Sequence, residues 1–224
     1  MKINSSKTKT IIFNFTNNYQ FTTRLKLNNQ VLDSVSETKL LGTIVTSDLK
    51  WDKNTENIVK KAYARMELLK KLSSFGAPIP DLKKVYLTSI RSHCEHSSSV
   101  WHSGLTKQNK DDIERIQKIA LKIILKGSYK NYENALKVMD LSTLEERRKD
   151  LLLTFAQKCL KNPKMKNLFP PNNRTHIMNP RQYEHFQVLK ANTERMNQSP
   201  IITMQRLLNE NIKKKMEIDS IWNN

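Results

Sequence analysis

Residues 111–127 read DDIERIQKIALKIILKG, and this stretch decides the fold class. Apolar residues recur in it at the three- and four-residue spacing that places side chains on one face of a helix. They are Ile113, Ile116, Ala120, Ile123 and Ile124. Asp111 and Asp112 stand where acidic side chains stabilise the first turn of a helix, and Gly127 is typical of a helix end. The stretch therefore predicts an amphipathic helix that begins at the two aspartates.

The same periodicity occurs on both sides of this helix. Before it, a stripe over residues 58–72 predicts a helix closed by Gly76, and a second helix is expected to start at Pro80 and to continue to Cys94. After it, a short helix is expected over residues 131–139.

Three features mark the C-terminal part of the chain. Ser142 and Glu145 have the spacing of a capping box and predict the start of a helix that stops before Pro163. The proline-containing stretch 163–200 indicates an extended or irregular chain, and a last helix is expected over about residues 201–218.

The first 50 residues have a different pattern. The segments 10–15, 21–27 and 39–45 are rich in β-branched, aromatic and alternating apolar residues, which predicts short strands of a small antiparallel sheet. Asn28 and Asn29 are typical of a tight turn between two of them. Together the patterns predict a mainly α protein with a small antiparallel β part at its N-terminus.

This fold class implies three regions along the chain. Residues 1–50 would form the β part, residues 51–162 a helical bundle, and residues 163–224 an irregular, partly helical extension.

The chain is strongly basic. Its 224 residues include 39 Lys and Arg against 21 Asp and Glu, a net charge of +18. This excess is spread over the whole chain, which fits a surface that lies along a polyanion such as nucleic acid. Codon bias is the alternative, because an AT-rich genome would also encode a chain rich in Lys and Asn.

Composition also excludes several classes of protein. No apolar run reaches the roughly 18 residues of a membrane span, and four scattered glycines exclude a glycine-rich phosphate loop. Two cysteines cannot make a disulfide scaffold, which favours an intracellular protein of the nucleus or the cytoplasm.

Basic residues follow the predicted helices in stripes, and these are the candidate nucleic-acid contacts. Solvated helix faces also carry such stripes, so the alternative of a purely solvating role stays open. The candidates are Lys60, Lys61, Arg65, Arg115, Lys118, Lys122, Lys126, Arg147 and Arg148.

Candidates for catalysis and metal binding are weaker. Asp111 and Asp112 open a helix, whereas a metal-binding pair of a polymerase would lie on a hairpin. The ligand-type residues at 93–96 and His102 match no metal-ligand spacing, and Cys94 and Cys159 fall on apolar helix faces. We expect no catalytic residue, no metal site and no cofactor.

Several short motifs follow one another in a recognisable order. They are NSSKTK (residues 4–9), KLLGTI (39–44) with DLKW (48–51), YLTSIRS (86–92) with VWH (100–102), ERIQK (114–118), LEERR (144–148), and SPI (199–201) with QRLLN (205–209). This order resembles the late palm, primer grip and thumb of reverse transcriptases from jockey-like non-LTR retrotransposons. The resemblance covers about residues 3–210 and implies that Leu41 and Gly42 stand in the primer grip.

The resemblance also implies a function. In that family, Mg²⁺-binding carboxylates upstream of the NSSKT-like strand perform RNA-directed DNA synthesis, and no residues here match them. We therefore expect a truncated reverse transcriptase fragment of a transposable element, not catalytic on its own, that binds an RNA–DNA or other duplex backbone without sequence specificity. The alternative is a structural helical protein with no nucleic-acid partner, which self-associates through the apolar palm remnant. No membrane partner is expected.

Overall fold

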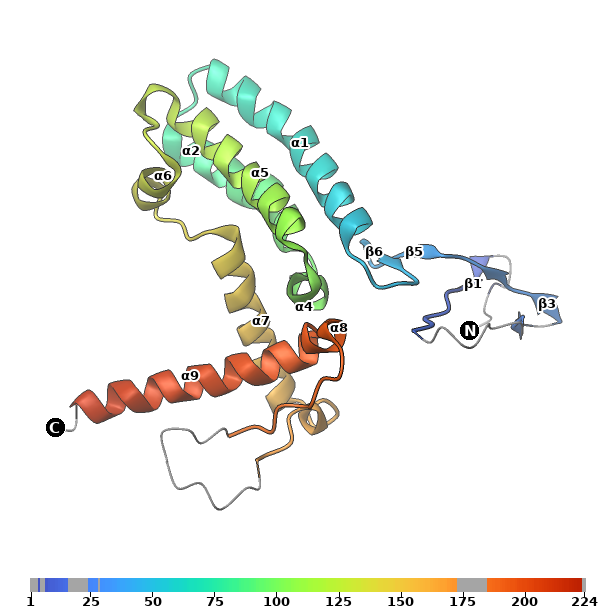
Figure 1. Ribbon diagram of the computed structural model, residues 1–224. Helices are drawn as coiled ribbons and strands as arrows, with labels where there is room; N and C mark the ends of the chain where they lie inside the picture. The colour runs from blue at the N-terminus through green and yellow to red at the C-terminus, as the bar shows by residue number, and fades with distance from the viewer. Residues whose placement is uncertain (1–3, 5–6, 16–23, 28, 173–184, 223–224) are drawn as a thin grey trace. The chain divides into compact units, whose positions relative to one another are not determined.

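The computed structural model describes residues 4, 7–15, 24–27, 29–172 and 185–222, and these are mainly α-helical (Figure 1). Described strands occur only before residue 47. The predicted fold class is thus confirmed. None of the helices in these ranges combines the length and the apolar character needed to cross a bilayer.

The chain divides into two compact units. Unit 1 comprises residues 1–94 and 105–126, and unit 2 comprises residues 95–104 and 127–224. The predicted helical region 51–162 is therefore shared between the units, because the segment 95–104 joins the C-terminal helices whereas 105–126 returns to the N-terminal ones.

Short strand pairs lie at the beginning of unit 1. β5 (Glu37–Leu40) and β6 (Thr43–Thr46) form an antiparallel hairpin, as do β2 (Lys26–Leu27) and β3 (Gln30–Val31). A third pair, β1 (Lys9–Thr10) and β4 (Asp33–Ser34), runs parallel, so the expected single antiparallel sheet is three separate pairs.

Parts of the strand prediction lie outside the described residues. These parts are residues 21–23 and Asn28. Asn29, which follows them, has a φ of 63° beside the start of β3, as tight hairpin turns require.

A hydrogen-bonded turn connects β6 to the first long helix, α1 (Asp52–Ser74). The Thr46 hydroxyl donates to the Asp48 carboxylate at 2.6 Å, and the Lys50 amide donates to the same oxygen at 3.1 Å. Further on, the buried Asn54 side chain accepts from the Ile44 amide at 3.0 Å. These bonds fix the hairpin to the N-terminus of α1.

α1 packs against α5 (Lys107–Leu125), and the two helices lie side by side in Figure 1. Their buried faces supply the core of unit 1. The apolar core residues on these two helices are Ile58, Ala62, Met66, Leu69, Ile113, Ile116, Ala120, Leu121, Ile124 and Leu125.

The predicted second helix is three segments in succession. They are α2 (Ile79–Val85), the π-helical turn η2 (Tyr86–Arg91) and α3 (Ser92–Glu95). In η2 the buried Tyr86 hydroxyl donates to the side-chain carbonyl of Gln117 on α5, which satisfies two polar groups inside the core.

α5 begins four residues before the predicted aspartate pair. Thr106 is its N-cap, and its side-chain oxygen accepts from the Asn109 amide at 3.2 Å. The expectation that this helix begins at Asp111 and Asp112 is therefore wrong. The early start is stabilised by the buried Asn109, whose side chain donates to Asp52 of α1 at 2.8 Å.

Unit 2 contains short helical segments and two long helices. The segments are α4 (Ser98–Trp101), η3 (His102–Gly104), η4 (Lys126–Ser128, whose first residue belongs to unit 1), α6 (Tyr132–Met139), η5 (Lys166–Leu168) and α8 (Glu194–Asn197). The long helices are α7 (Leu144–Lys161) and α9 (Pro200–Trp222).

α7 starts with a capping box, but one residue later than predicted. Thr143 and Glu146 form it, and not Ser142 and Glu145. Both pairs have the required spacing, so the sequence alone does not decide between them. The end of α7 at Lys161 agrees with the predicted stop before Pro163.

α7 and α9 share the core of unit 2. Leu152, Ala156 and Cys159 from α7 are buried with Phe169 and with Met204 and Leu208 from α9. The irregular chain between the two helices is held by side chains of α9. Gln205 accepts from the Leu189 amide at 3.0 Å and donates to the Leu168 carbonyl at 2.8 Å.

We predict that Asp48 makes the stability of unit 1 depend on pH in the acid range. The Thr46 hydroxyl and the Lys50 amide hold the pKa of Asp48 below its usual value of 3.8. The ionised Asp48 therefore adds to the free energy of unfolding above a pH of about 4, and this contribution is lost as the pH falls through the lowered pKa. Urea unfolding midpoints at pH 6 and pH 3 should differ less for Asp48→Asn than for the unchanged protein.

Asp111→Asn, which alters an exposed carboxylate on α5, is the matched control for this prediction. An equal pH dependence in the two variants would show that the turn at Asp48 makes no contribution.

Candidate nucleic-acid interface

The strongest candidate surface is the solvent face of α5. Arg115, Lys118 and Lys122 are all exposed, at positions i, i+3 and i+7. With 100° per residue they lie on the side of α5 opposite to its buried face. Phosphates in solution can therefore reach these three predicted residues. We call Arg115, Lys118 and Lys122 the α5 stripe.

Acidic residues accompany one end of the α5 stripe. Asp111 is exposed one turn before Arg115, and Asp112 accepts from the Gln108 side chain at 3.0 Å. Arg115 lies 4.0 Å from Asp112, with both side chains partly in solvent. Such an exposed pair is weak and can exchange for a phosphate.

α1 carries the second group of predicted contacts. Lys60 and Arg65 are exposed and Lys61 is half-buried. Lys61 and Arg65, four residues apart, share one side of α1, whereas Lys60 points about 100° further round the helix. In the part of the chain that the structure describes, these three side chains make no ion pair within 4.0 Å.

Lys126 has a structural role that the sequence did not indicate. Its side chain is exposed, but its ammonium group donates to the carbonyl oxygen of Ser73 in the last turn of α1. The Ser73 hydroxyl in turn donates to the Ile123 carbonyl at 3.0 Å. A cation at this position donates a hydrogen bond to a carbonyl in the last turn of α1 and interacts favourably with the negative end of the α1 dipole.

The two predicted arginines of α7 lie in different environments. The Arg147 side chain is half-buried and forms an ion pair with Glu95 at 3.1 Å. Arg148 is completely buried. Its guanidinium carbon lies over the Trp101 ring, 5.8 Å from the ring centroid, and its Nε donates to Nδ1 of His102 at 3.3 Å.

Arg148 is therefore not a nucleic-acid contact, and this prediction is wrong. Burial removes the side chain from any phosphate in solution, and its partners belong to the core of unit 2. The sequence contained a signal for this. Arg148 stands four residues from both Leu144 and Leu152, which are buried on the same face of α7.

The predicted primer-grip residues form the tip of a hairpin. Leu41 and Gly42 have φ values of 47° and 93° and connect β5 to β6, as two-residue hairpin turns with positive φ do. The Leu41 side chain is 87% exposed.

The residues considered for metal binding and catalysis are engaged elsewhere. Cys94 is buried, and its thiol donates to the Ile90 carbonyl at 3.7 Å. Burial also raises the pKa of the Cys159 thiol, which opposes nucleophilic reactivity. Within the described ranges, no three His, Cys, Asp or Glu side chains are grouped so that they could hold a metal ion.

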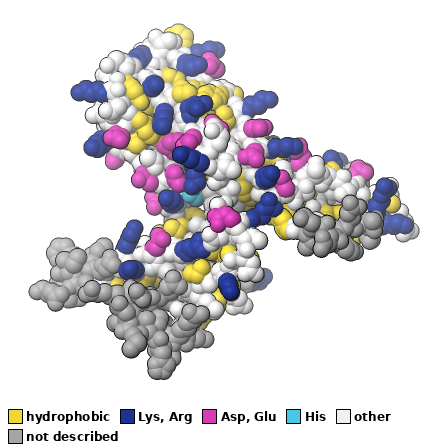
Figure 2. Space-filling view, viewed as in Figure 1, with side chains coloured by type: hydrophobic (Ala, Val, Ile, Leu, Met, Phe, Trp, Pro, Cys, Tyr) yellow, Lys and Arg dark blue, Asp and Glu magenta, His cyan; other side chains and the backbone are white. Residues whose placement is uncertain are grey.

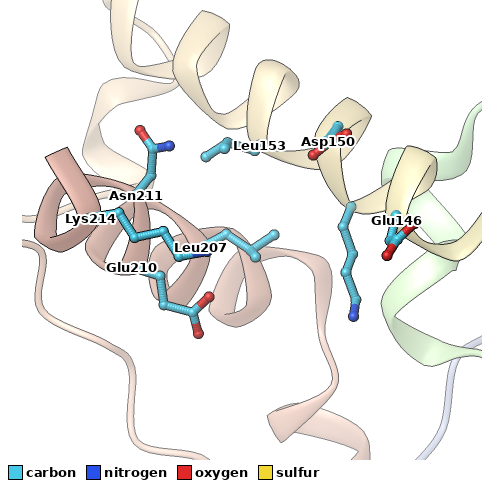
Figure 3. Close-up of a pocket in the computed structure, with 8 residues that line it drawn as sticks. Glu146, Asp150, Leu153, Leu207, Glu210, Asn211 and Lys214 are labelled. Carbon is cyan, nitrogen blue, oxygen red and sulfur yellow. The ribbon is translucent and has the colours of Figure 1, made fainter. Parts of the chain in front are cut away.

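A hollow of about 290 Å³ lies between α7 and α9 (Figure 3). Acidic and basic side chains from both helices surround it, so their charges largely cancel. Glu146 is already engaged in the capping box. We assign no function to this hollow. It is lined by Glu146, Lys149, Asp150, Leu153, Leu207, Glu210, Asn211 and Lys214.

Positive charge is widely distributed over the molecular surface. Figure 2 shows Lys and Arg side chains over the visible face, with acidic side chains between them.

A search against models of known protein families, curated proteins and solved structures found no match to this chain.

We predict that Arg148 stabilises unit 2. Arg148→Lys keeps the charge but loses the guanidinium group over Trp101 and the Nε–His102 bond. Together these losses should lower the free energy of unfolding by about 2–4 kcal/mol. Arg147→Lys, at the neighbouring half-exposed position, should lower the free energy of unfolding by less than about 1 kcal/mol. Urea unfolding of the two variants measures both values, and equal losses would contradict the assignment.

Proposed function

We propose that this chain binds the sugar–phosphate backbone of nucleic acid duplexes without base readout. In this proposal it acts as a thumb-like part of a reverse transcriptase of the jockey-like non-LTR retrotransposon group. The observation that carries the proposal is the α5 stripe. Arg115 and Lys122 are about 10 Å apart along the helix. Measured along the duplex axis, one strand of B-DNA carries about three phosphates over that length.

Three properties of α5 support this assignment. The stripe is exposed on the face opposite to the core, so it can contact a ligand without unfolding. The helix is held rigidly by its packing against α1. The groups of the stripe are long cationic side chains, which contact phosphates and carry little information about bases.

Replacing the α5 stripe with glutamine tests the proposal. The triple variant Arg115→Gln, Lys118→Gln, Lys122→Gln should weaken duplex binding to a similar extent for unrelated sequences. The slope of log K against log salt should shrink by about 0.9 for each B-DNA phosphate that the variant no longer neutralises. Helix stability should change little, because Gln has nearly the same helix propensity as Lys and Arg.

A charge-matched variant on another helix is the control for this test. Lys149→Gln, Lys158→Gln, Lys161→Gln removes the same charge from exposed positions of α7 and should leave the slope close to that of the unchanged protein. If the two triple variants bind the duplex equally weakly, only the total charge matters. An unchanged slope in both would support the codon-bias interpretation.

We also predict that the chain extends no primer on an RNA template with Mg²⁺ or Mn²⁺. Two-metal phosphoryl transfer needs carboxylates that converge on both cations. Asp111 and Asp112 are on the second turn of α5, where Asp112 accepts from Gln108. Extension that Asp111→Ala or Asp112→Ala abolishes would contradict this prediction.

Self-association is a second candidate function, favoured by exposed apolar side chains near the N-terminus. They lie on or beside the strand pairs of unit 1 and offer an apolar surface. They are Phe13, Phe15, Leu25, Val31, Leu40 and Leu41. A molar mass that rises with concentration in sedimentation equilibrium, and falls for Leu40→Ser with Leu41→Ser, would support this function.

A further inference from the structure

α1 carries a second apolar stripe in addition to the face that enters the core. Leu68 is 45% exposed, Leu72 is half-buried, and Phe75, the C-cap of the helix, is 86% exposed. With 100° per residue, these three side chains and the exposed Ala64 lie within about 80° of one another around the helix axis. We call Ala64, Leu68, Leu72 and Phe75 the α1 stripe.

The α1 stripe lies apart from the core of unit 1. The buried residues Ile58, Ala62, Met66 and Leu69 are centred about 120° further round the helix. They face α5, and Figure 1 shows α2 and α5 together on one side of α1. Burial in this core therefore does not account for the apolar side chains of the α1 stripe.

The spacing of the α1 stripe matches that of helix-to-helix contacts. Its members stand at i, i+4, i+8 and i+11, so they form a continuous row over about 16 Å, or three helical turns. Single exposed apolar residues are common on protein surfaces, whereas a continuous row marks a surface that a partner covers. An amphipathic helix places its own anchor residues at the same spacing.

Basic side chains border the α1 stripe on both sides. Lys60 and Lys71 lie along one edge and Arg65 along the other, and all three are exposed. Within the described ranges, none of them forms an ion pair within 4.0 Å. Glu67, beyond the edge formed by Lys60 and Lys71, is already paired with Lys70 at 2.7 Å. The border is therefore positive, and the partner that complements it is acidic.

We infer that the α1 stripe is the docking surface for an acidic amphipathic helix of a partner protein. Apolar residues of that helix pack on Leu68, Leu72 and Phe75, and its Asp and Glu side chains face the basic border. The α5 stripe takes no part in this contact, so the inference goes beyond the proposed function.

Charge and shape favour this occupant over two others. Two copies of this chain that met through the α1 stripe would bring like charges together, which disfavours a homodimer. A lipid surface takes up the whole apolar side of an interfacial helix, but the wider apolar face of α1 already packs in the core.

A synthetic acidic peptide tests the inference on the full chain. The probe is a fluorescein-labelled helix of Ala, Glu and Leu, with leucines at i, i+4, i+7 and i+11. Fluorescence anisotropy should show saturable binding to the unchanged protein and about tenfold weaker binding to Leu68→Gln and to Phe75→Gln. Tyr63→Gln is the matched control, because Tyr63 is exposed on another side of α1, and it should leave the affinity unchanged.

A second peptide tests the contribution of charge. It has Gln in place of every Glu, and the unchanged protein should bind it at least about fivefold more weakly than the acidic peptide. The double variant Arg65→Gln, Lys71→Gln should bind the two peptides with nearly equal affinity. Gln has a helix propensity close to that of the residues it replaces here, and circular dichroism checks that each variant keeps its helices.

The other outcomes overturn the inference. They include no binding of the acidic peptide by the unchanged protein, and equal binding by Leu68→Gln and Tyr63→Gln. If Leu68→Gln lowers only the molar mass in sedimentation equilibrium, the occupant is a second copy, and if it lowers only binding to phosphatidylserine vesicles, the occupant is a lipid surface. Duplex binding by the α5 triple variant tests the proposed function separately, and Leu68→Gln should leave duplex binding unchanged.

Discussion

The packing of α1 against α5 is the interaction on which unit 1 depends. Each helix buries one apolar face in the other, and this burial leaves the opposite face of α5 in solvent. The positions of Arg115, Lys118 and Lys122 follow from it, because a side chain half a turn from the core cannot reach the core. Ser73 and Lys126 close the far end of the same pair, so the helix ends are held together as well as the middle.

Helical periodicity predicted most of this arrangement. The stripes over 58–72 and 113–124 both correspond to observed helices, since a buried face repeats every three or four residues. Helix starts were predicted less well. Thr106 begins α5 through a hydrogen bond to Asn109, in a stretch with no apolar pattern to mark it. At α7 two overlapping capping boxes fit the sequence, and only the backbone geometry selects Thr143.

Only part of the candidate site could be predicted, because the sequence shows which residues are charged but not which of them are buried. Arg147 and Arg148 are adjacent and both are arginines, yet Arg147 is half-exposed and pairs with an acid, whereas the guanidinium of Arg148 lies over Trp101 in the interior. Arg148 lies four residues from both Leu144 and Leu152, and this shared helix face indicated that it is buried. No comparable local signal marks Lys126, because its partner Ser73 is 53 residues away in the chain.

The basic residues therefore fall into three physical kinds, although the formal charge of +18 counts them alike. Arg148 is part of a core, and Arg147 and Lys126 hold elements of their own unit together. The α5 stripe and the predicted contacts Lys60 and Arg65 of α1 are exposed, so phosphates in solution could reach them. Counterion release depends only on cations that reach phosphates. Under the proposed function, the salt dependence of duplex binding should therefore be set by these exposed helix faces and be smaller than the net charge of the chain would imply.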